Sequence, residues 1–313
     1  MKIAIIGSGA IGGLFGARLS GAGLNVVLYD VKKSLIETIT REGITIETPS
    51  GEKNTFPVKI TDDITGIGEV DLVVICVKGY HTRSAVDGAL PIIGKDTRIL
   101  SIQNGVGNIE TIADAIGDPA KVMGGSMKSN VLPVSFTRLL YSRGEDLVFG
   151  PMDGNVKQIH HDIAETVKKS GIQAKVTENI QGALWTKVSH NVMNALAAVL
   201  WMTNDEYLNY PSAVSLWQMA VKETADVAAA QGIVLDEPED PWAGPRKVYE
   251  MWHQTGSKGK ATTLQDLEMG RKTEVDIING AVVEAGRRLN IPTPANEVLT
   301  FLVEALEEKR GIR

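Results

Sequence analysis

The sequence predicts an α/β domain with a parallel, doubly wound sheet, followed by an all-α helical domain. Short apolar runs alternate with helical stretches in the first half, which is typical of a parallel sheet with helices on both faces. After about Glu178 helical patterns dominate, and no strong strand pattern follows. The length of 313 residues is natural for two domains. We therefore expect a first domain at residues 1–178 and a second domain at residues 179–313.

The elements of the first domain follow from runs of apolar residues. Four runs predict strands buried in a parallel sheet, at residues 3–6, 25–29, 71–77 and 98–102. Apolar and small residues at helical spacing predict helices at residues 10–22 and 32–41. Two β-rich runs at residues 45–46 and 56–60 flank Pro49-Ser50-Gly51, so we expect a hairpin there.

Helical periodicity defines the second domain. It predicts helices at residues 180–200, 212–231, 263–289 and 296–310. Between them, the polar and proline-rich residues 236–260 predict a long loop broken by one short helix near residues 248–253. Loops of this length are often lids or disordered segments.

Composition argues against several classes of function. The formal net charge is -6 and the pI is about 5.5, so we expect no nucleic-acid partner. The single cysteine, Cys76, allows no intrachain disulfide and fits a cytoplasmic protein. No run of about 20 apolar residues exists, so we expect no membrane span. The five histidines show no metal-ligand spacing, so we expect no metal site.

A glycine-rich segment follows the first predicted strand and opens the first predicted helix. Its residues are Gly7, Ser8, Gly9, Ala10, Ile11 and Gly12, with the spacing G-x-G-x-x-G. The first glycine allows a tight turn, the second lets a pyrophosphate approach, and the third permits close packing of helix on strand. The helix N-terminus offers N–H groups to phosphate. The segment therefore predicts a dinucleotide-binding Rossmann domain rather than a purely structural turn.

Asp30 ends the second predicted strand and bears on the choice of cofactor. A carboxylate at this position accepts hydrogen bonds from ribose hydroxyls and repels a 2′-phosphate, which favours NAD. Lys32 and Lys33 follow closely and would soften that repulsion, so NADP is not excluded. Asp30 could also cap the helix that begins near Lys32, and the two roles are compatible.

Four groups of segments resemble the 2-dehydropantoate 2-reductase (ketopantoate reductase) family over essentially the whole chain. They are residues 2–12, residues 77–78 with 103–107, residues 183–187, and residues 264–266 with 270–280; Gly286 and residues 291–296 fit the family as well. The resemblance implies an oxidoreductase of pantothenate biosynthesis that uses NAD(P)H to reduce a small 2-oxo acid, with ketopantoate or a close analogue as substrate.

The resemblance also implies roles for individual residues. Lys187 would be the general acid that protonates the ketone oxygen as hydride reaches the carbon, which is chemically sound because an ammonium stabilises alkoxide charge. Glu274 would face cofactor and substrate and tune Lys187. Asn104 would contact the nicotinamide ribose and the substrate, and Lys78 would lie at the edge of the cofactor. Thr262 stands where the family usually has a serine that binds the substrate carboxylate.

A polar stripe on an otherwise apolar helix supports this assignment. Lys187, Asn191 and Asn194 fall at i, i+4 and i+7, which places them on one helical face. A lone lysine on a helix is ordinarily a solvated residue, but buried amides need a partner or a ligand. The family usually spaces its two helix asparagines by four residues, whereas Asn191 and Asn194 are three apart, so Asn194 is the firmer match. His190 is an alternative to Asn191 as the other polar group on this helix. Asn204 matches a further substrate-site asparagine of the family if one residue is deleted between Lys187 and Asn194.

Two further departures concern substrate and cofactor. Gly259 stands where the family has an asparagine, so one substrate contact is missing or is supplied by Lys258 or Lys260. The arginine that suits NADP is absent, because Asp30 and Val31 stand at that position.

Two other functions stay open from the sequence. A dehydrogenase of the β-hydroxyacid type shares the Rossmann domain, a helical domain and a catalytic lysine. A non-catalytic NAD(H)-binding sensor would need only the glycine segment. The helical second domain contains several tryptophans, which favours a homodimer.

Overall fold

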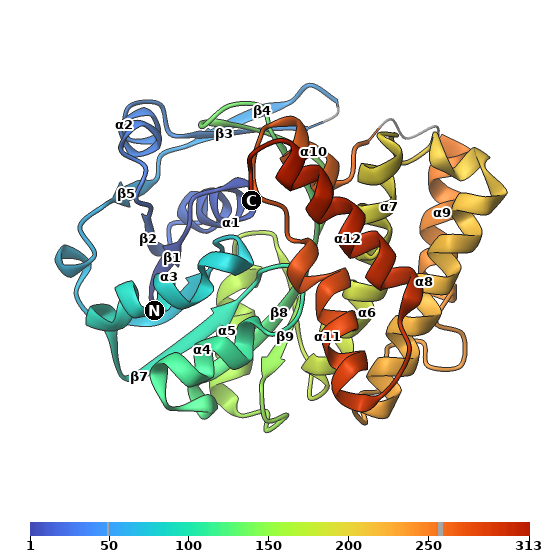
Figure 1. Ribbon diagram of the computed structural model, residues 1–313. Helices are drawn as coiled ribbons and strands as arrows, with labels where there is room; N and C mark the ends of the chain where they lie inside the picture. Colours follow the sequence, from blue (N-terminus) through green and yellow to red (C-terminus); the bar gives the residue numbers. More distant parts are fainter. Residues whose placement is uncertain (49, 256–258) are drawn as a thin grey trace. The chain divides into compact units, whose positions relative to one another are not determined.

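The computed structural model describes residues 1–48, 50–255 and 259–313. The chain divides into two compact units (Figure 1). The first unit comprises Met1–Gln103 and Asn108–Ile180, and the second unit comprises Asn104–Gly107 and Gln181–Arg313. The second unit therefore includes a short segment that interrupts the first unit along the chain.

The first unit is built on a ten-stranded sheet in the order β4-β3-β9-β8-β7-β6-β1-β2-β5, with β10 beside β9. The strands are β1 (Lys2–Ile6), β2 (Asn25–Tyr29), β3 (Ile44–Glu47), β4 (Lys53–Phe56), β5 (Lys59–Thr61), β6 (Val70–Ile75), β7 (Ile93–Ser101), β8 (Val122–Pro133), β9 (Arg138–Pro151) and β10 (Gln173–Val176). In the sheet, β2 and then β5 lie on one side of β1, and β6, β7 and β8 follow one another on the other side. All of these neighbouring strands pair in parallel. This reversal between β1 and β6 confirms the predicted doubly wound sheet.

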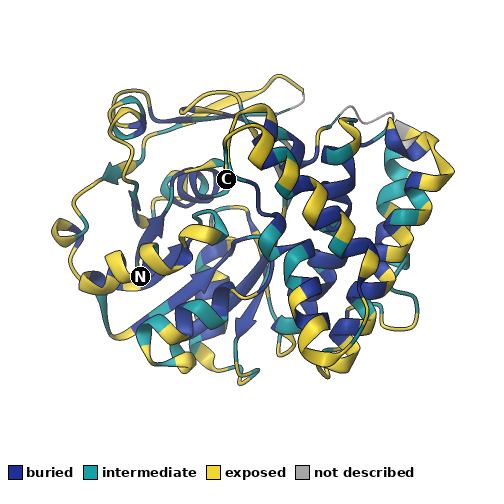
Figure 2. Cartoon of the chain, viewed as in Figure 1, coloured by how far each residue is buried: buried dark blue, intermediate teal, exposed yellow. Residues whose placement is uncertain are grey.

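The central strands are buried because both of their faces carry apolar side chains. Ile3, Ile5, Leu72 and Val74 are fully buried, and the middle of the sheet is dark blue in Figure 2. Four of the expected strands correspond to β1, β2, β6 and β7, although β7 begins at Ile93, earlier than predicted. Long apolar runs gave a clear signal because a strand covered on both faces has no polar alternation.

The outer part of the sheet differs from the prediction. β3 and β4 form the expected antiparallel hairpin, with Ile44 opposite Phe56, but residues 56–60 are not one strand. Phe56 ends β4, and β5 pairs in parallel with β2. The longest pair, β8 with β9, is antiparallel and was not predicted. β8 contains Gly124, Gly125 and several polar residues, which have low β-propensity, so pairing with neighbouring strands fixes its conformation.

The helices of the first unit are α1 (Ala10–Gly21), α2 (Lys33–Glu42), α3 (Thr82–Ala89), α4 (Asn108–Ile116) and α5 (Gln158–Lys168). α1 and α2 match the two predicted helices within one residue at each end. α1 buries Leu14, Phe15 and Leu19 in the core, which fixes the glycine-rich segment that precedes it.

The described residues of the second unit contain helices and no strand, as predicted. The helices are α6 (Ile180–Asn191), α7 (Met193–Leu200), α8 (Pro211–Ala230), α9 (Ala243–Thr255), α10 (Thr262–Glu268), α11 (Asn279–Leu289) and α12 (Pro294–Lys309). None of these described helices is both long and apolar enough to cross a bilayer.

Two predicted helices are each divided in the structure. The helix expected at residues 180–200 is interrupted at Val192, between α6 and α7. The carbonyl oxygen of Val192 accepts a hydrogen bond from Asn279 Nδ2 at 3.1 Å. The helix expected at residues 263–289 is two helices, because Gly270 follows α10 with a φ of +65°. Glycine in this left-handed conformation commonly ends a helix.

The prediction of a long loop at residues 236–260 is largely wrong. α9 occupies residues 243–255, far more than the short helix predicted near residues 248–253. The stretch before α9 is anchored, because the Asp236 amide donates to Thr186 Oγ1 at 2.9 Å. Trp242 packs edge-on against buried Trp217, with 4.7 Å between ring centroids. Lys258 and its neighbours at 256–257 lie outside the described residues.

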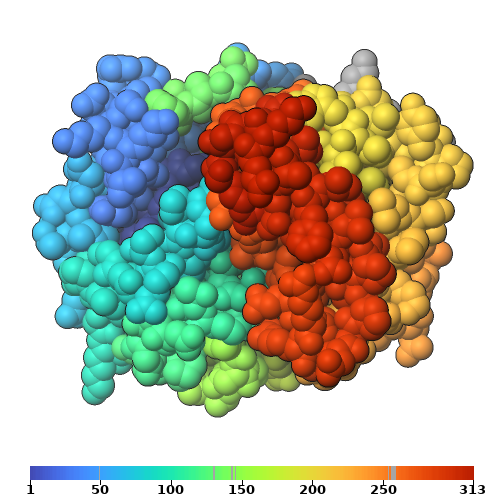
Figure 3. Space-filling view, viewed as in Figure 1, coloured from blue at the N-terminus to red at the C-terminus, as the bar shows by residue number. Residues whose placement is uncertain are grey.

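A buried polar network joins three helices of the second unit. Glu223 of α8 accepts hydrogen bonds from the amides of Ala295 and Asn296, in the first turn of α12, at 2.8 and 2.9 Å. Asn296 Oδ1 in turn accepts from Asn279 Nδ2 at 3.1 Å. A carboxylate at a helix N-terminus satisfies otherwise unpaired N–H groups and complements the helix dipole. The other face of α12 lies at the surface, drawn in red in Figure 3.

We predict that Gly12→Ala lowers the thermal unfolding midpoint by roughly 2–10 °C. A Cβ at Gly12 would lie 2.0 Å from the Gly7 carbonyl oxygen, so the backbone would have to move. Calorimetry of the purified protein measures the change. Gly88→Ala is the matched control, because its Cβ would meet no atom within 4 Å and alanine favours the α3 helix. Equal midpoints for the two variants would contradict the prediction.

Candidate active site

The glycine-rich segment turns tightly between β1 and α1. Gly7 has a φ of +97°, and a Cβ on it would lie 2.9 Å from Val77 Cγ1. A Cβ on Gly12 would strike the Gly7 carbonyl oxygen at 2.0 Å, whereas a Cβ on Gly9 would meet nothing within 4 Å. Gly7 and Gly12 are therefore required by packing. Among the described residues, no atom would meet a Cβ on Gly9, so its bare backbone is open to a ligand.

The start of α1 fits a phosphate group. Gly9 is the N-cap and makes no side-chain cap, and the first turn from Ala10 and Ile11 carries no acidic residue. Ser8 Oγ is buried and has no hydrogen-bond partner among the residues that the structure describes. Free N–H groups, the positive end of the helix dipole and an unpaired hydroxyl together suit the pyrophosphate of a dinucleotide.

Asp30 is held beside the glycine-rich segment. Its Oδ2 accepts a hydrogen bond from the Ser8 amide at 2.8 Å, and its Oδ1 accepts from the Lys32 amide at 3.1 Å. The neighbouring Val31 side chain is exposed. The carboxylate thus has a fixed orientation at the end of β2, where a dinucleotide places its adenosine ribose.

Lys78 and Gln103 follow β6 and β7, the two strands next along the sheet. Lys78 is the N-cap residue of a short 3-10 helix. The Gln103 amide group donates to the Val77 carbonyl at 2.9 Å and to Thr82 Oγ1 at 2.8 Å. Gln103 therefore ties the ends of the two strands together, a role that sequence reasoning missed. Burial raises the pKa of the Cys76 thiol and so disfavours its reactive thiolate form.

The predicted polar stripe lies on two helices instead of one. Lys187 and Asn191 belong to α6, with Asn191 as its last residue, and Asn194 belongs to α7. Lys187 and Asn191 are half-buried and Asn194 is buried. The amide of Val192 still bonds to the Val188 carbonyl at 2.9 Å, so the interruption is local. His190, the alternative to Asn191, places Nε2 2.3 Å from where a Cβ on Gly244 would lie, so it packs against α9.

Two further candidate residues lie near the start of α10. Asn194 Nδ2 is 3.5 Å from Oγ1 of Thr262, the first residue of α10. Asn204 donates its backbone N–H to the Gly259 carbonyl at 2.9 Å. Asn204 is buried, and its Oδ1 has no hydrogen-bond partner among the described residues. An unpaired buried acceptor is costly, and a ligand hydroxyl would satisfy it.

Asn104 and Glu274 meet within the second unit, although 170 residues separate them in the chain. Asn104 Nδ2 donates to Glu274 Oε2 at 3.3 Å. The Val106 amide donates to the Ile277 carbonyl at 3.1 Å, and a Cβ on Gly105 would lie 2.4 Å from that same oxygen. Gly105, with a φ of +79°, therefore permits the close approach that brings the two candidate residues together.

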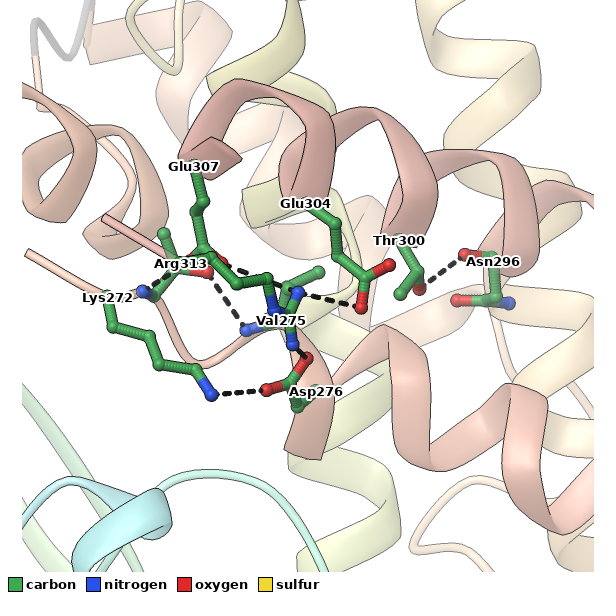
Figure 4. Close-up of polar contacts among 9 residues, drawn as sticks. Lys272, Val275, Asp276, Asn296, Thr300, Glu304, Glu307 and Arg313 are labelled. Atoms are coloured by element: carbon green, nitrogen blue, oxygen red, sulfur yellow. Dashed lines mark hydrogen bonds and ion pairs between the residues drawn. The ribbon is translucent and has the colours of Figure 1, made fainter. Parts of the chain in front are cut away.

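The segment that carries Glu274 is surrounded by charged residues (Figure 4). Asp276 accepts from Arg313 at 2.6 Å and from Lys272 at 3.0 Å. Burial opposes ionisation of Asp276, but these hydrogen bonds outweigh it and lower the pKa of the carboxyl. Burial likewise opposes the charge of Arg313, and the bond to Asp276 raises the pKa of the guanidinium above its usual value. Asp276, two residues after Glu274 in the chain, and Arg313 are therefore both ionised at neutral pH.

Among the described residues, no three histidine, cysteine, aspartate or glutamate side chains lie together in a way that could hold a metal ion.

Comparisons with known proteins give a consistent result over the whole chain. A family model described as ketopantoate reductase PanE/ApbA matches residues 3–154, and the model of the C-terminal part of that family matches residues 179–307. The chain is similar to 2-dehydropantoate 2-reductase of Pyrococcus horikoshii, with 31% identity over 313 residues and 99% of each chain covered.

Two solved structures are similar as well. One is a PanE/ApbA family ketopantoate reductase from Ralstonia eutropha JMP134, with 28% identity and a TM-score of 0.87, covering 99% of this chain and 100% of that one. The other is D-mandelate dehydrogenase with NADH and anilino(oxo)acetate, with 25% identity and a TM-score of 0.91, covering 100% of both chains.

Proposed function

The chain belongs to the ketopantoate reductase PanE/ApbA family, and on that premise we propose that it reduces the ketone of a small 2-oxo acid to the 2-hydroxy acid. Ketopantoate is the first candidate substrate. Residues 1–178 would bind the cofactor, and residues 179–313 would bind the substrate. Asn104, from the first of these ranges, would also contact the substrate. The observation that carries the proposal is the contact between Asn104 and Glu274, because it unites two distant segments that resemble the family.

In this proposal the chemistry at the ketone depends on Lys187. A bound reduced nicotinamide supplies the hydride that the ketone carbon accepts. Alkoxide charge then develops on the ketone oxygen, and the Lys187 ammonium stabilises that charge and donates the proton. Glu274 is buried, and in this proposal its carboxylate would favour the ammonium form of Lys187 through the attraction between opposite charges. Asn104 would orient Glu274 through the hydrogen bond between them, and it would contact the nicotinamide ribose when the cofactor is bound.

Four polar residues of the second unit would orient the substrate. Asn191 and Asn194 follow Lys187 along the chain, and Thr262 lies next to Asn194, so these groups suit the carboxylate and ketone of a 2-oxo acid. Asn204 Oδ1 needs a donor, and the terminal hydroxyl of ketopantoate is a donor. This unpaired oxygen favours a hydroxylated substrate over a purely apolar one.

The cofactor is NAD(P)H, and we propose that NADH is preferred. Asp30 is fixed by the Ser8 amide, so its negative charge cannot easily move away from an incoming 2′-phosphate. The similar D-mandelate dehydrogenase structure contains NADH. Ser8, Gly9, Ala10 and Ile11 would bind the pyrophosphate, and Gly7 and Gly12 give the segment its shape. Lys78, after β6, would lie at the edge of the cofactor.

Family membership favours a reductase over the two alternatives from the sequence, the β-hydroxyacid-type dehydrogenase and the NAD(H) sensor.

A homodimer remains part of the proposal. The exposed side chains of Val298, Phe301 and Leu302 on α12 support it, because exposed apolar residues commonly mark contact surfaces.

An assay of substrate preference tests the proposal. We expect NAD(P)H oxidation with ketopantoate to have a kcat/KM at least about tenfold above that for its deoxy analogue, which lacks only the terminal hydroxyl. The reason is that the analogue leaves Asn204 Oδ1 unpaired. Absorbance of the reduced nicotinamide follows the reaction.

Benzoylformate serves as the comparison substrate, because D-mandelate dehydrogenase is a structural neighbour. If kcat/KM is higher for benzoylformate than for ketopantoate, the substrate class is aryl 2-oxo acids instead. Nucleotide binding without turnover of any 2-oxo acid would favour the sensor instead.

Lys187→Ala should reduce kcat on the order of a hundredfold to ten-thousandfold, because no group then protonates the alkoxide. Binding of NADH, measured by titration of nucleotide fluorescence, should be unchanged. Lys222→Ala is the control, since Lys222 is an exposed lysine that pairs with Asp226 on α8. An undiminished kcat in Lys187→Ala would exclude the proposed general acid.

Asp30→Asn should raise the ratio of NADPH to NADH kcat/KM on the order of tenfold. The asparagine oxygen can still accept from the Ser8 amide, so the segment keeps its shape while the charge that repels a 2′-phosphate is removed. Asp62→Asn, at an exposed position, provides the control. If the wild-type protein prefers NADPH and the ratio does not change in Asp30→Asn, the carboxylate does not select the cofactor.

A further inference from the structure

The backbone on both sides of Glu274 is held by residues at the C-terminal end of α12 and beyond it (Figure 4). Thr273 and Val275, the neighbours of Glu274, are fully buried. The Val275 amide bonds back to Thr273 Oγ1 at 3.3 Å, which makes this part of the chain a compact turn. Contacts on either side of the turn therefore determine where the Glu274 carboxylate lies.

The first contact is made by Glu307, which has no exposed surface. Its Oε1 accepts a hydrogen bond from the Thr273 amide at 2.7 Å. Glu307 lies in the last turn of α12, where the helix dipole is unfavourable to a carboxylate. Burial adds a desolvation cost. A carboxylate with two such penalties must be compensated by partners.

The second contact is made by Arg313, which links α12 to the other side of Glu274. Its guanidinium lies 3.5 Å from Glu307 Oε2, 2.8 Å from Glu304 Oε1 and 2.6 Å from Asp276 Oδ1. Lys272 completes the group by pairing with Asp276 at 3.0 Å. Arg313 thus lies within ion-pair distance of the buried Glu307, whose Oε2 makes no hydrogen bond among the described residues. Through Asp276, Arg313 also fixes the backbone two residues after Glu274.

We propose that Glu307 and Arg313 are positioning residues for Glu274, which they hold in place through Thr273 and Asp276. This inference rests on the proposed function. Neither residue touches Glu274 in the contacts described above, and both act on the backbone that carries it. Small displacements of a catalytic group are costly, so loosening these contacts should lower turnover more than it lowers binding.

The first experiment is a double-mutant cycle of Arg313→Ala and Glu274→Gln. Arg313→Ala alone should lower kcat for the 2-oxo acid on the order of tenfold, with KM for NAD(P)H unchanged. In the Glu274→Gln background, Arg313→Ala should have no further effect on kcat, because the group that it positions is already altered. Additive losses would overturn the proposal.

Arg287→Ala is the matched control. Arg287 forms an exposed ion pair with Glu297 that joins α11 and α12. Among the contacts of the described residues, Arg287 has no hydrogen bond or ion pair with residues 272–277. The control should retain the wild-type kcat. A loss of kcat equal to that in Arg313→Ala would show a general effect of removing an arginine from this unit, and would overturn the proposal.

Glu307→Gln and Glu307→Leu separate positioning from folding. Glutamine can still accept from the Thr273 amide, so kcat in Glu307→Gln should stay close to the wild-type value, whereas Glu307→Leu should lower it as Arg313→Ala does. Equal losses of kcat in both variants would contradict a role that acts through the Thr273 amide.

Hydrogen exchange gives a measurement that does not depend on activity. Arg313→Ala should increase deuterium uptake in peptides covering residues 272–278 and leave peptides of α8 unchanged. Unchanged uptake in residues 272–278 would overturn the proposal even if no substrate is turned over. If Glu274→Gln has no effect on kcat while uptake rises in Arg313→Ala, then the proposed catalytic role of Glu274 fails and the structural contact stands.

Discussion

The helical unit depends on the hydrogen bonds made by the buried carboxylate of Glu223. This carboxylate accepts hydrogen bonds from the backbone amides at the start of α12. The same network continues through Asn296 and Asn279 to the Val192 carbonyl. A buried carboxylate without a cation is stable only when hydrogen bonds replace its hydration. Three helices, α8, α11 and α12, are thereby fixed relative to the interruption that divides Lys187 and Asn191 from Asn194.

α12 is consequently held by a carboxylate at each end, with opposite electrostatics. At its N-terminus, Glu223 of a neighbouring helix complements the dipole. At its C-terminus, its own Glu307 opposes the dipole, accepts a hydrogen bond from the Thr273 amide and lies 3.5 Å from Arg313. The first arrangement stabilises the packing of the unit. The second arrangement connects the end of α12 to the short segment that carries Glu274.

Local patterns predicted the parts of the fold that local forces determine. The strand, glycine-rich turn and helix around Gly7 and Gly12 depend on neighbouring residues, and so do the fully buried strands. β8 and β9 were not predicted, because pairing with neighbouring strands, and not the β-propensity of their residues, makes them strands. At the interruption, the Val192 carbonyl is bonded by Asn279, which is distant in sequence and therefore gave no local signal. For the site, the family resemblance indicated Lys187, Asn104 and Glu274, and helical spacing grouped Lys187 with Asn191 and Asn194. The contact between Asn104 and Glu274 joins segments that are distant in sequence, so no local pattern could predict it.

The position of Asn104–Gly107 has a consequence for how the chain can be divided. The backbone passes between the two units at three places, around residues 103, 107 and 180. A single cut near residue 180 therefore cannot yield two complete parts, because the fragment 181–313 would lack the residues that bind the Ile277 carbonyl and Glu274. The helical unit is thus complete only within the continuous polypeptide, and ancestral or engineered exchange of this unit between relatives would have to carry the short insert along with it.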